Sequence, residues 1–383
     1  MRPLTRREFL RESFGLLISA SILKHFQFST GESFPNLVIA RNGTPQKLIK
    51  AGLDTIGGIK TVVKTGQNVV IKVNMSWNAD PSQVATTNPD LVHALVQECV
   101  NAGASNVLVL DHTIDNGEMC LDRTQMEEKV KQAGGKIKAI NSERDYREVN
   151  IPGKELKKAL VSRDVLDADV FINVPIAKVH NSAGTTLSMK NLMGIVWDRK
   201  EFHWRGLDQC IADLSSLVKP DLIVLDAYKI LMTRGPRGPG TVKETGEVVL
   251  GADPVAVDVY GTMLLEKDPC GIEYITNAAE LGIGQPDIEK INTVYVDAQK
   301  TVSGEPPAEP TPAETQPPES QPPEPTEPKS EEPVQLTPAE TQPPEPEKEK
   351  EKEVGIPFIL VIPVMIISLL IGLRMRNQNQ NKE

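Results

Sequence analysis

The stretch from Asn173 to Gly194, NVPIAKVHNSAGTTLSMKNLMG, follows an apolar run with a series of hydrogen-bond donors. These donors include two lysines, a histidine, two threonines and an amide, namely Lys178, His180, Thr185, Thr186, Lys190 and Asn191. Lysine ammonium groups with neighbouring hydroxyls suit the oxygens of a phosphate or a carboxylate. The stretch therefore predicts a binding site for a small anion, and a solvated polar loop is the alternative interpretation.

Polar residues also stand at the ends of four strand-like apolar runs. They are Asn74, Asp111, Asn173 and Asp226. In an open α/β sheet, ligands bind beyond the carboxyl ends of the strands, so these side chains are expected to collect at one edge. That edge is the predicted site. The alternative is that each Asp or Asn only caps or turns the chain after its strand.

Two further carboxylates lie in the segment GADPVAVDVYG. Asp253 precedes Pro254 and is expected to cap a helix, whereas Asp258 falls within the otherwise apolar residues 255–260. A buried carboxylate requires a partner, and a lysine or a metal ion would serve. Asp111, Asp253 and Asp258 are accordingly the candidate ligands of a divalent metal ion, whose identity stays open.

These residues support more than one class of function. In an enzyme that acts on a small anionic substrate, Lys178 and Lys190 would hold the anion and His180 would serve as acid or base, oriented by Asp226. Lys190 lies in the apolar segment SMKNLMG and is predicted to contact the ligand or the carboxylates of Asp226 and Asp258. The alternatives are a non-catalytic protein that captures a ligand for a membrane partner, and a redox relay.

The elements that must position these residues alternate between strands and helices. VVIKVN (69–74), a helix from Pro89 to Ala102 and VLVLD (107–111) form a βαβ unit with Asn88 as N-cap and Gly103 as the stop. Further strands are predicted at 37–41, 136–140, 170–174, 222–226, 248–251 and 293–296, and further helices at 124–133, 207–217, 254–265 and 272–281. The predicted fold class is α/β, with one domain over residues 36–303, a largely parallel sheet and flanking helices.

The charge of the chain is concentrated in one segment. Residues 304–353 hold 14 Glu and 4 Lys, a balance of 4 − 14 = −10 that equals the formal net charge of the whole chain, −10. The remainder is neutral overall, so no basic field indicates nucleic acid. The four cysteines, Cys99, Cys120, Cys210 and Cys270, show no CxxC spacing, which argues against an iron-sulfur cluster within this chain.

The two ends of the sequence predict export and membrane attachment. TRREFLR at 5–11 resembles a twin-arginine export signal, and the apolar run that follows is too short to span a bilayer. The region 1–35 is therefore a predicted signal that engages the twin-arginine translocase. Residues 304–353 are a Pro/Glu-rich linker, because proline-rich runs build no core. Residues 354–373 are twenty uncharged residues that predict one transmembrane helix, followed by a cytoplasmic tail at 374–383.

These predictions together describe a single-pass cell-membrane protein. Its folded domain would be extracytoplasmic and carried on a flexible stalk, because the export signal sets the orientation that the lysines and arginines around residues 354–373 leave undecided.

The combination of segments resembles the domain-of-unknown-function 362 family. The segments are KVN (72–74), NVPIAKVHNSAGTTLSMKNLMG, KPDLIVLDA (219–227) and GADPVAVD (251–258). The resemblance places motif positions on Lys72, Asn74, Lys178, His180, Thr186, Lys190, Asn191, Asp226, Asp253 and Asp258, and it adds Lys72 and Asn74 to the candidate ligand-binding residues. It also implies a prokaryotic protein, often with a twin-arginine signal and sometimes with a ferredoxin-type domain. This chain lacks the cluster cysteines, so a redox role would require a separate ferredoxin-like partner, and it has Val73 where many relatives have proline.

Overall fold

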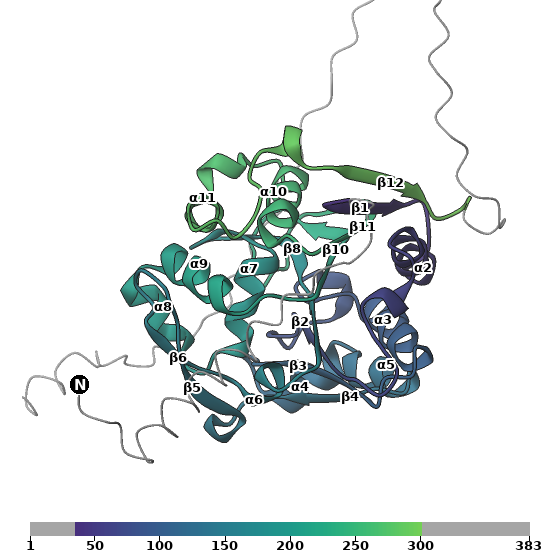
Figure 1. Ribbon diagram of the computed structural model, residues 1–383, viewed down its shortest axis with the longest axis horizontal. Coiled ribbons are helices and arrows are strands. Elements are labelled where there is room, and N and C mark those ends of the chain that lie inside the picture. The colour runs from purple at the N-terminus through teal and green to yellow at the C-terminus, as the bar shows by residue number, and fades with distance from the viewer. Residues whose placement is uncertain (1–34, 301–383) are drawn as a thin grey trace, which may run out of the picture. The chain divides into compact units, whose positions relative to one another are not determined.

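The computed structural model describes residues 35–300 (Figure 1). The two strands of the predicted βαβ unit belong to its central sheet. The described residues all lie in one compact unit. The predicted signal, linker, transmembrane helix and cytoplasmic tail lie outside the described residues. Within residues 35–300, no helix combines the length and the apolar character that a membrane crossing requires.

The described chain alternates strands and helices. The strands are β1 (Leu37–Arg41), β2 (Asn68–Val73), β3 (Asn106–Asp111), β4 (Lys136–Ala139), β5 (Tyr146–Asn150), β6 (Lys158–Ser162), β7 (Val170–Val174), β8 (Ile176–His180), β9 (Gly184–Thr186), β10 (Leu222–Leu231), β11 (Val242–Gly251) and β12 (Thr293–Asp297). The helices are α2 (Pro45–Thr55), α3 (Pro89–Asn101), α4 (Gly117–Arg123), α5 (Met126–Gln132), α6 (Arg163–Leu166), α7 (Ser188–Asn191), α8 (Arg199–Arg205), α9 (Leu207–Leu217), α10 (Pro254–Leu264) and α11 (Glu273–Glu280).

The main sheet has the strand order β12-β1-β11-β10-β7-β2-β3-β4. Strands β10, β7, β2, β3 and β4 are parallel to their neighbours in this run, which confirms a largely parallel sheet. Strand β11 is antiparallel to both β1 and β10. Strand β8 continues from β7 along β10 and turns back into β9, so a short hairpin extends the sheet at the carboxyl end of β7.

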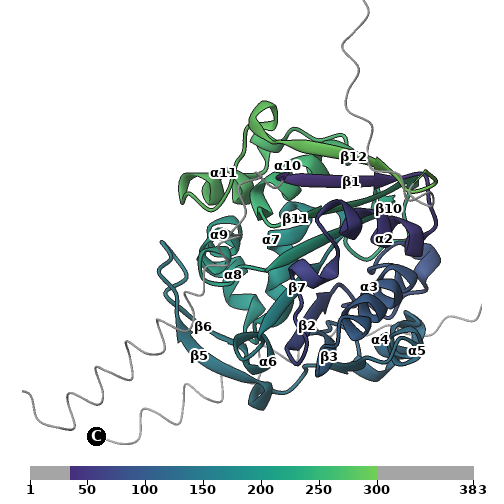
Figure 2. The same cartoon turned by 45° about the vertical axis from the view of Figure 1, so that its right-hand side comes forward.

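Helices cover both faces of the sheet (Figure 2). One apolar core joins α2, α3 and α5 to the sheet, and another joins α9, α10 and α11 to its opposite face. The strands in the middle are apolar on both faces because both faces are covered, as the fully buried pattern of β7 illustrates. The sheet is thereby held rigid between two layers, and its carboxyl edge is the part that faces solvent-accessible loops.

Local sequence signals explain where the helices begin. The side chain of Asn88 accepts a hydrogen bond from the Asp90 N–H at the start of α3, with Pro89 at the first helical position. Asp253 accepts from the amides of Val255 and Ala256 at the start of α10, as its position before Pro254 predicts. Both helices therefore start where the sequence analysis placed them.

Candidate functional site

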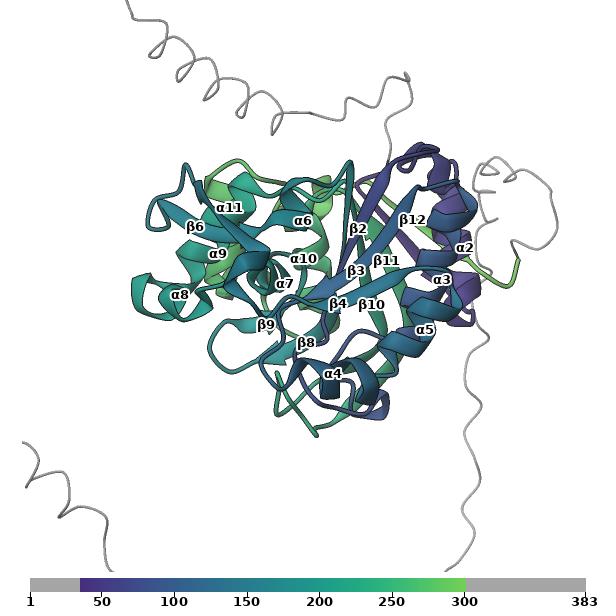
Figure 3. The ribbon, with the colours of Figure 1, turned by 90° about the horizontal axis from the view of Figure 1, so that it is seen from below.

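The carboxyl ends of the parallel strands gather the predicted polar residues. Lys72 lies near the end of β2, Asp111 ends β3 and Asn173 lies near the end of β7. In Figure 3 the β8–β9 hairpin and helix α4 both lie on the side of the sheet at which β2, β3 and β4 end. The hairpin register sets Lys178 opposite Thr186, so residues from four segments of the chain meet at this edge.

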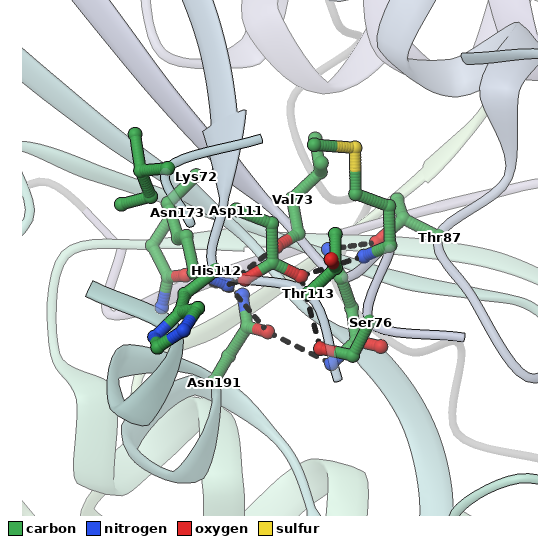
Figure 4. A network of polar contacts seen from close by, with 12 residues as sticks. Lys72, Val73, Ser76, Thr87, Asp111, His112, Thr113, Asn173 and Asn191 are labelled. Atoms are coloured by element: carbon green, nitrogen blue, oxygen red, sulfur yellow. Dashed lines mark hydrogen bonds and ion pairs between the residues drawn. The ribbon is translucent and has the colours of Figure 1, made fainter. Parts of the chain in front are cut away.

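A buried ion pair joins β2 to β3 at this edge (Figure 4). The Nζ of Lys72 lies 2.9 Å from Asp111 Oδ1, and both side chains are at most 1% exposed. The same Nζ donates to Asn191 Oδ1 at 3.2 Å and to the carbonyl of Val73. Burial lowers the pKa of Lys72, and the Asp111 carboxylate opposes that effect. Three oxygen acceptors, one of them charged, therefore surround this ammonium group.

The other oxygen of Asp111 holds the chain after β2. Asp111 Oδ2 accepts hydrogen bonds from the Met75 N–H at 2.8 Å and from Ser76 Oγ at 3.1 Å. Gly194 packs against the ion pair so closely that an added Cβ would lie 2.2 Å from Asp111 Oδ1 and 2.6 Å from Lys72 Nζ. A side chain at position 194 would therefore displace the pair.

Three asparagine amides form a directed chain beside the ion pair. Asn74 Nδ2 donates to Asn191 Oδ1 at 3.0 Å, Asn191 Nδ2 donates to Asn173 Oδ1 at 2.8 Å, and Asn173 Nδ2 donates to Ser188. This order leaves Asn74 Oδ1 as the acceptor that faces Lys178 Nζ, 3.0 Å away. The chain thus fixes the direction of the hydrogen bond that Lys178 makes.

Lys178 is buried and has no carboxylate partner within the described residues. Its Nζ donates to Asn74 Oδ1 and to the carbonyl of Ala85, and it forms no ion pair within residues 35–300. Burial lowers the pKa of Lys178 to about 7; the charge of Asp111 opposes this, and the charges of Lys190 and Lys72 add to it. This lysine differs from Lys72 because its acceptors are neutral.

Lys190 points toward the same edge but not at the carboxylates predicted for it. Its Nζ contacts the thioether Sδ of Met193 at 3.1 Å. Burial and the charge of Arg199 lower the pKa of Lys190 to about 8. Of the two alternatives predicted for Lys190, contact with Asp226 and Asp258 is wrong, because backbone amides hold both carboxylates. Contact with a ligand stays a prediction.

Those amides also explain the two buried carboxylates. Asp226 accepts from the N–H groups of Asn88 and Tyr228, and Asp258 accepts from Ser188 and Met189 at the start of α7. Burial raises the pKa of Asp226 to about 7. Both carboxylates therefore fix the backbone around the site.

The structure does not assemble Asp111, Asp253 and Asp258 as metal ligands. Asp253 accepts from backbone amides at the start of α10 and from the Gln285 N–H, whereas Asp111 pairs with Lys72. In residues 35–300, no three His, Cys, Asp or Glu side chains come together in a way that could hold a metal ion.

Two histidines at the edge have opposite tautomers. His180 Nδ1 lies 3.1 Å from the Ser182 N–H and 3.3 Å from the Ala183 N–H, so Nδ1 accepts and Nε2 carries the proton. His112 Nδ1 lies 2.9 Å from the Val196 carbonyl, so Nδ1 donates and Nε2 is the acceptor. Burial and the charges of Lys190 and Lys178 lower the pKa of His180 to about 3, and burial also lowers the pKa of His112. Both rings are therefore neutral near pH 7.

These groups line a cavity of about 550 Å³. The cations of its lining are Lys72, Lys178, Lys190, Arg199 and Lys200, its histidines are His112, His180 and His203, and its one carboxylate within the described residues is that of the exposed Asp198. Asn74, Thr186 and Asn191 also line it, as does Pro236 from the loop between β10 and β11. Thr185 instead hydrogen-bonds Tyr274 at 2.7 Å, and Asp226 is outside the lining.

The sequence analysis missed part of the lining. The missed residues include Trp77, His112, Trp197, Arg199 and His203. Arg199 donates to the carbonyls of His112 and Thr113, and the His112 and Trp197 rings stack with centroids 5.2 Å apart. The basic and aromatic run WDRKEFHWR at 197–205 was the available signal, because it follows the donor-rich stretch directly.

Comparisons with known proteins identify the family. The family "Domain of unknown function (DUF362)" matches residues 69–263, and the chain belongs to it. The thylakoid-associated protein sll1697 of Synechocystis sp. is 26% identical over 247 residues, which are 60% of this chain and 73% of that protein.

Two solved structures show only a distant likeness. The lactate racemase apoprotein of Thermoanaerobacterium thermosaccharolyticum aligns with a TM-score of 0.41 at 11% identity, over 62% of this chain and 58% of that one. A Thermotoga maritima protein aligns with a TM-score of 0.36 at 12% identity, over 62% of this chain and 60% of that one. This chain thus spans less than two thirds of either structure.

Proposed function

We propose that the protein is an enzyme that acts on a small anionic substrate, a carboxylate or a phosphate, in the cavity at the carboxyl edge of the sheet. The observation that carries the proposal is the charge of the cavity. Lys178, Lys190 and Arg199 line it and form no ion pair within residues 35–300, whereas the one lining carboxylate in the described residues, that of Asp198, is exposed. Buried ammonium groups without a counterion are unfavourable. An anionic substrate would supply the missing charge.

The side chains divide into holders and proton carriers. Lys190 and Arg199 would hold the anion, because they remain cationic donors at neutral pH and line the cavity. Lys178 and the His112 Nε2 are the groups that can accept a proton, since the amine titrates near pH 7 and that ring nitrogen is free to accept. His180, assigned as acid or base from the sequence, would instead donate a hydrogen bond from its neutral Nε2–H.

Tryptophan fluorescence can report binding in the cavity. Trp77 and Trp197 line it, whereas Trp204 is 87% exposed and can be replaced by Phe to reduce background. Small carboxylates and phosphates titrated into the Trp204→Phe protein should change its fluorescence. NMR of the same mixtures should show that the protein converts an anion that it binds. Lys178→Met should keep binding and lose conversion. Binding without conversion of any bound anion would indicate a non-catalytic ligand-binding protein instead.

The predicted export signal and apolar segment 354–373 support a membrane-anchored, extracytoplasmic placement of this enzyme. The thylakoid association in the name of the cyanobacterial relative agrees with a membrane setting. Protease added to intact spheroplasts should remove the folded domain from the membrane fraction. Full protection of the domain would contradict this topology.

A further inference from the structure

We infer that Lys178 is a nucleophile that forms an imine with the carbonyl carbon of a small anionic aldehyde or ketone, such as a 2-oxo acid. This inference rests on the proposed function, because it names the substrate class of the same cavity. It adds covalent chemistry to a site that otherwise only binds and moves protons.

The first observation is the hydrogen-bond inventory of the Lys178 amine. A neutral amine has two N–H donors and one lone pair, and Nζ has two oxygen acceptors, Asn74 Oδ1 at 3.0 Å and the Ala85 carbonyl. The Asn74 amide cannot turn to offer its nitrogen, because Nδ2 is committed to Asn191. Two neutral acceptors thus satisfy the neutral amine and leave its lone pair unengaged within residues 35–300.

The electrostatics agree with this geometry. Burial and the neighbouring charges of Lys190 and Lys72 bring the pKa of Lys178 to about 7, although Asp111 acts in the opposite direction. A large fraction of the amine is therefore unprotonated near neutral pH. Neutral amines are the form in which lysine attacks carbonyl carbon.

The second observation is an unpartnered hydroxyl directly across the hairpin. Thr186 pairs with Lys178 in the β8–β9 register, lines the cavity and is 4% exposed. Its Oγ1 has no hydrogen-bond partner within the described residues. A buried hydroxyl without a partner is unfavourable, and a ligand oxygen beside Lys178 would satisfy it.

The chemical step needs no co-reactant. The Lys178 lone pair attacks the carbonyl carbon, and a proton from nitrogen passes to the carbonyl oxygen to give a carbinolamine. The carbon–oxygen bond then breaks, and the oxygen leaves as water once it has received a second proton from the Lys190 ammonium. The iminium ion that remains returns its N–H proton to Lys190. Amine and carbonyl thus yield imine and water, with no change of oxidation state. Arg199 keeps its charge and holds the anionic group throughout.

Reductive trapping of the full-length protein tests the inference. The protein is incubated with pyruvate, dihydroxyacetone phosphate or acetone and sodium cyanoborohydride, and then examined by intact mass and peptide mapping. The expected adduct has the mass of the carbonyl compound less one oxygen atom and maps to Lys178. Pyruvate and dihydroxyacetone phosphate distinguish a carboxylate from a phosphate ligand, and acetone should react at least tenfold less.

The same digest contains its own controls. Exposed lysines such as Lys47 are expected to stay unmodified at pH 7, and Lys178→Arg should abolish the adduct while keeping the charge. Because peptide mapping of the wild type locates the adduct, the test holds even if the variant does not fold. If pyruvate or dihydroxyacetone phosphate changes the tryptophan fluorescence but leaves Lys178 unmodified, the imine proposal is wrong and the binding site stands. Absence of both binding and adduct would overturn both proposals.

Discussion

The lysines at the two ends of the cavity have different kinds of partner. At the paired end, formed by Lys72, Asp111 and Asn191, the ammonium group lies 2.9 Å from a carboxylate. At the unpaired end, formed by Lys178, Lys190 and His180, the lysines have neutral acceptors, and their pKa values fall to about 7 and about 8. One carboxylate thus distinguishes the two ends: Lys72 has a charged partner, whereas Lys178 is the amine that we propose to react.

The contrast extends to the buried acids of the domain. Asp213, Asp226 and Asp258 accept hydrogen bonds from backbone amides and form no ion pair within residues 35–300. Backbone donors satisfy these carboxylates without neutralising any lysine. The unpaired end therefore remains cationic although the domain as a whole carries many acids.

The largest effect is expected where the paired end is broken. Asp111→Ala leaves the Lys72 ammonium buried without a counterion and removes the acceptor of the Met75 N–H. Such a change should lower the free energy of unfolding by about 3–5 kcal/mol. Urea denaturation measures it, and the double variant Asp111→Ala/Lys72→Met should recover part of the loss. A change below about 1 kcal/mol would show that the pair is not structural.

Gly194→Ala tests how closely the paired end is packed. The added methyl would overlap both Asp111 and Lys72, and overpacking of this kind costs about 1–3 kcal/mol. Gly271→Ala is the matched control, because its added Cβ meets no atom within 4 Å. Equal stability of the two variants in thermal denaturation would mean that the pair can move without cost.

The stability of the unpaired end should depend on pH. Lys178 has a folded-state pKa of about 7 and an ordinary value of 10.5. Between these values the unfolded chain binds more protons, so the folded state gains stability as pH rises. Relative to Lys178→Met, the wild type should gain about 2 kcal/mol from pH 7 to pH 9, since one proton contributes about 1.4 kcal/mol per pH unit. A constant difference in urea denaturation would assign Lys178 an ordinary pKa.

The sequence predicts features that neighbouring residues determine, and it does not predict contacts between residues that lie far apart along the chain. The βαβ unit and the caps Asn88 and Asp253 were predicted, because hydrophobic periodicity and helix capping depend on residues that are close in the sequence. The carboxyl-edge site followed from polar residues at strand ends. The roles within it did not, because the partners of Lys72, Lys178 and Asp258 come from distant segments. His112 and Arg199 were missed for the same reason, since only the fold brings them to the lysines.

The hairpin shows a further limit. The sequence from Lys178 to Thr186 has no alternating apolar pattern, so no strand was predicted there, yet β8 and β9 pair. Strand β8 forms because β10 extends beyond its predicted end at residue 226 and offers it an edge. Pairing with β10, which no local pattern encodes, thus supports the hairpin in which Lys178 lies opposite Thr186.

The central claim is that the unpaired end binds an anion through protonated lysine. The direct test is a titration of the Trp204→Phe protein with phosphate at pH 7, 8 and 9, in which the fluorescence of Trp77 and Trp197 is followed. Because the pKa of Lys190 is about 8, Kd should rise as pH rises, approaching tenfold per pH unit above pH 8. Lys190→Met should weaken binding at pH 7 and remove most of this dependence, whereas the exposed control Lys131→Met should change neither. A Kd that is independent of pH and unchanged in Lys190→Met would contradict the account.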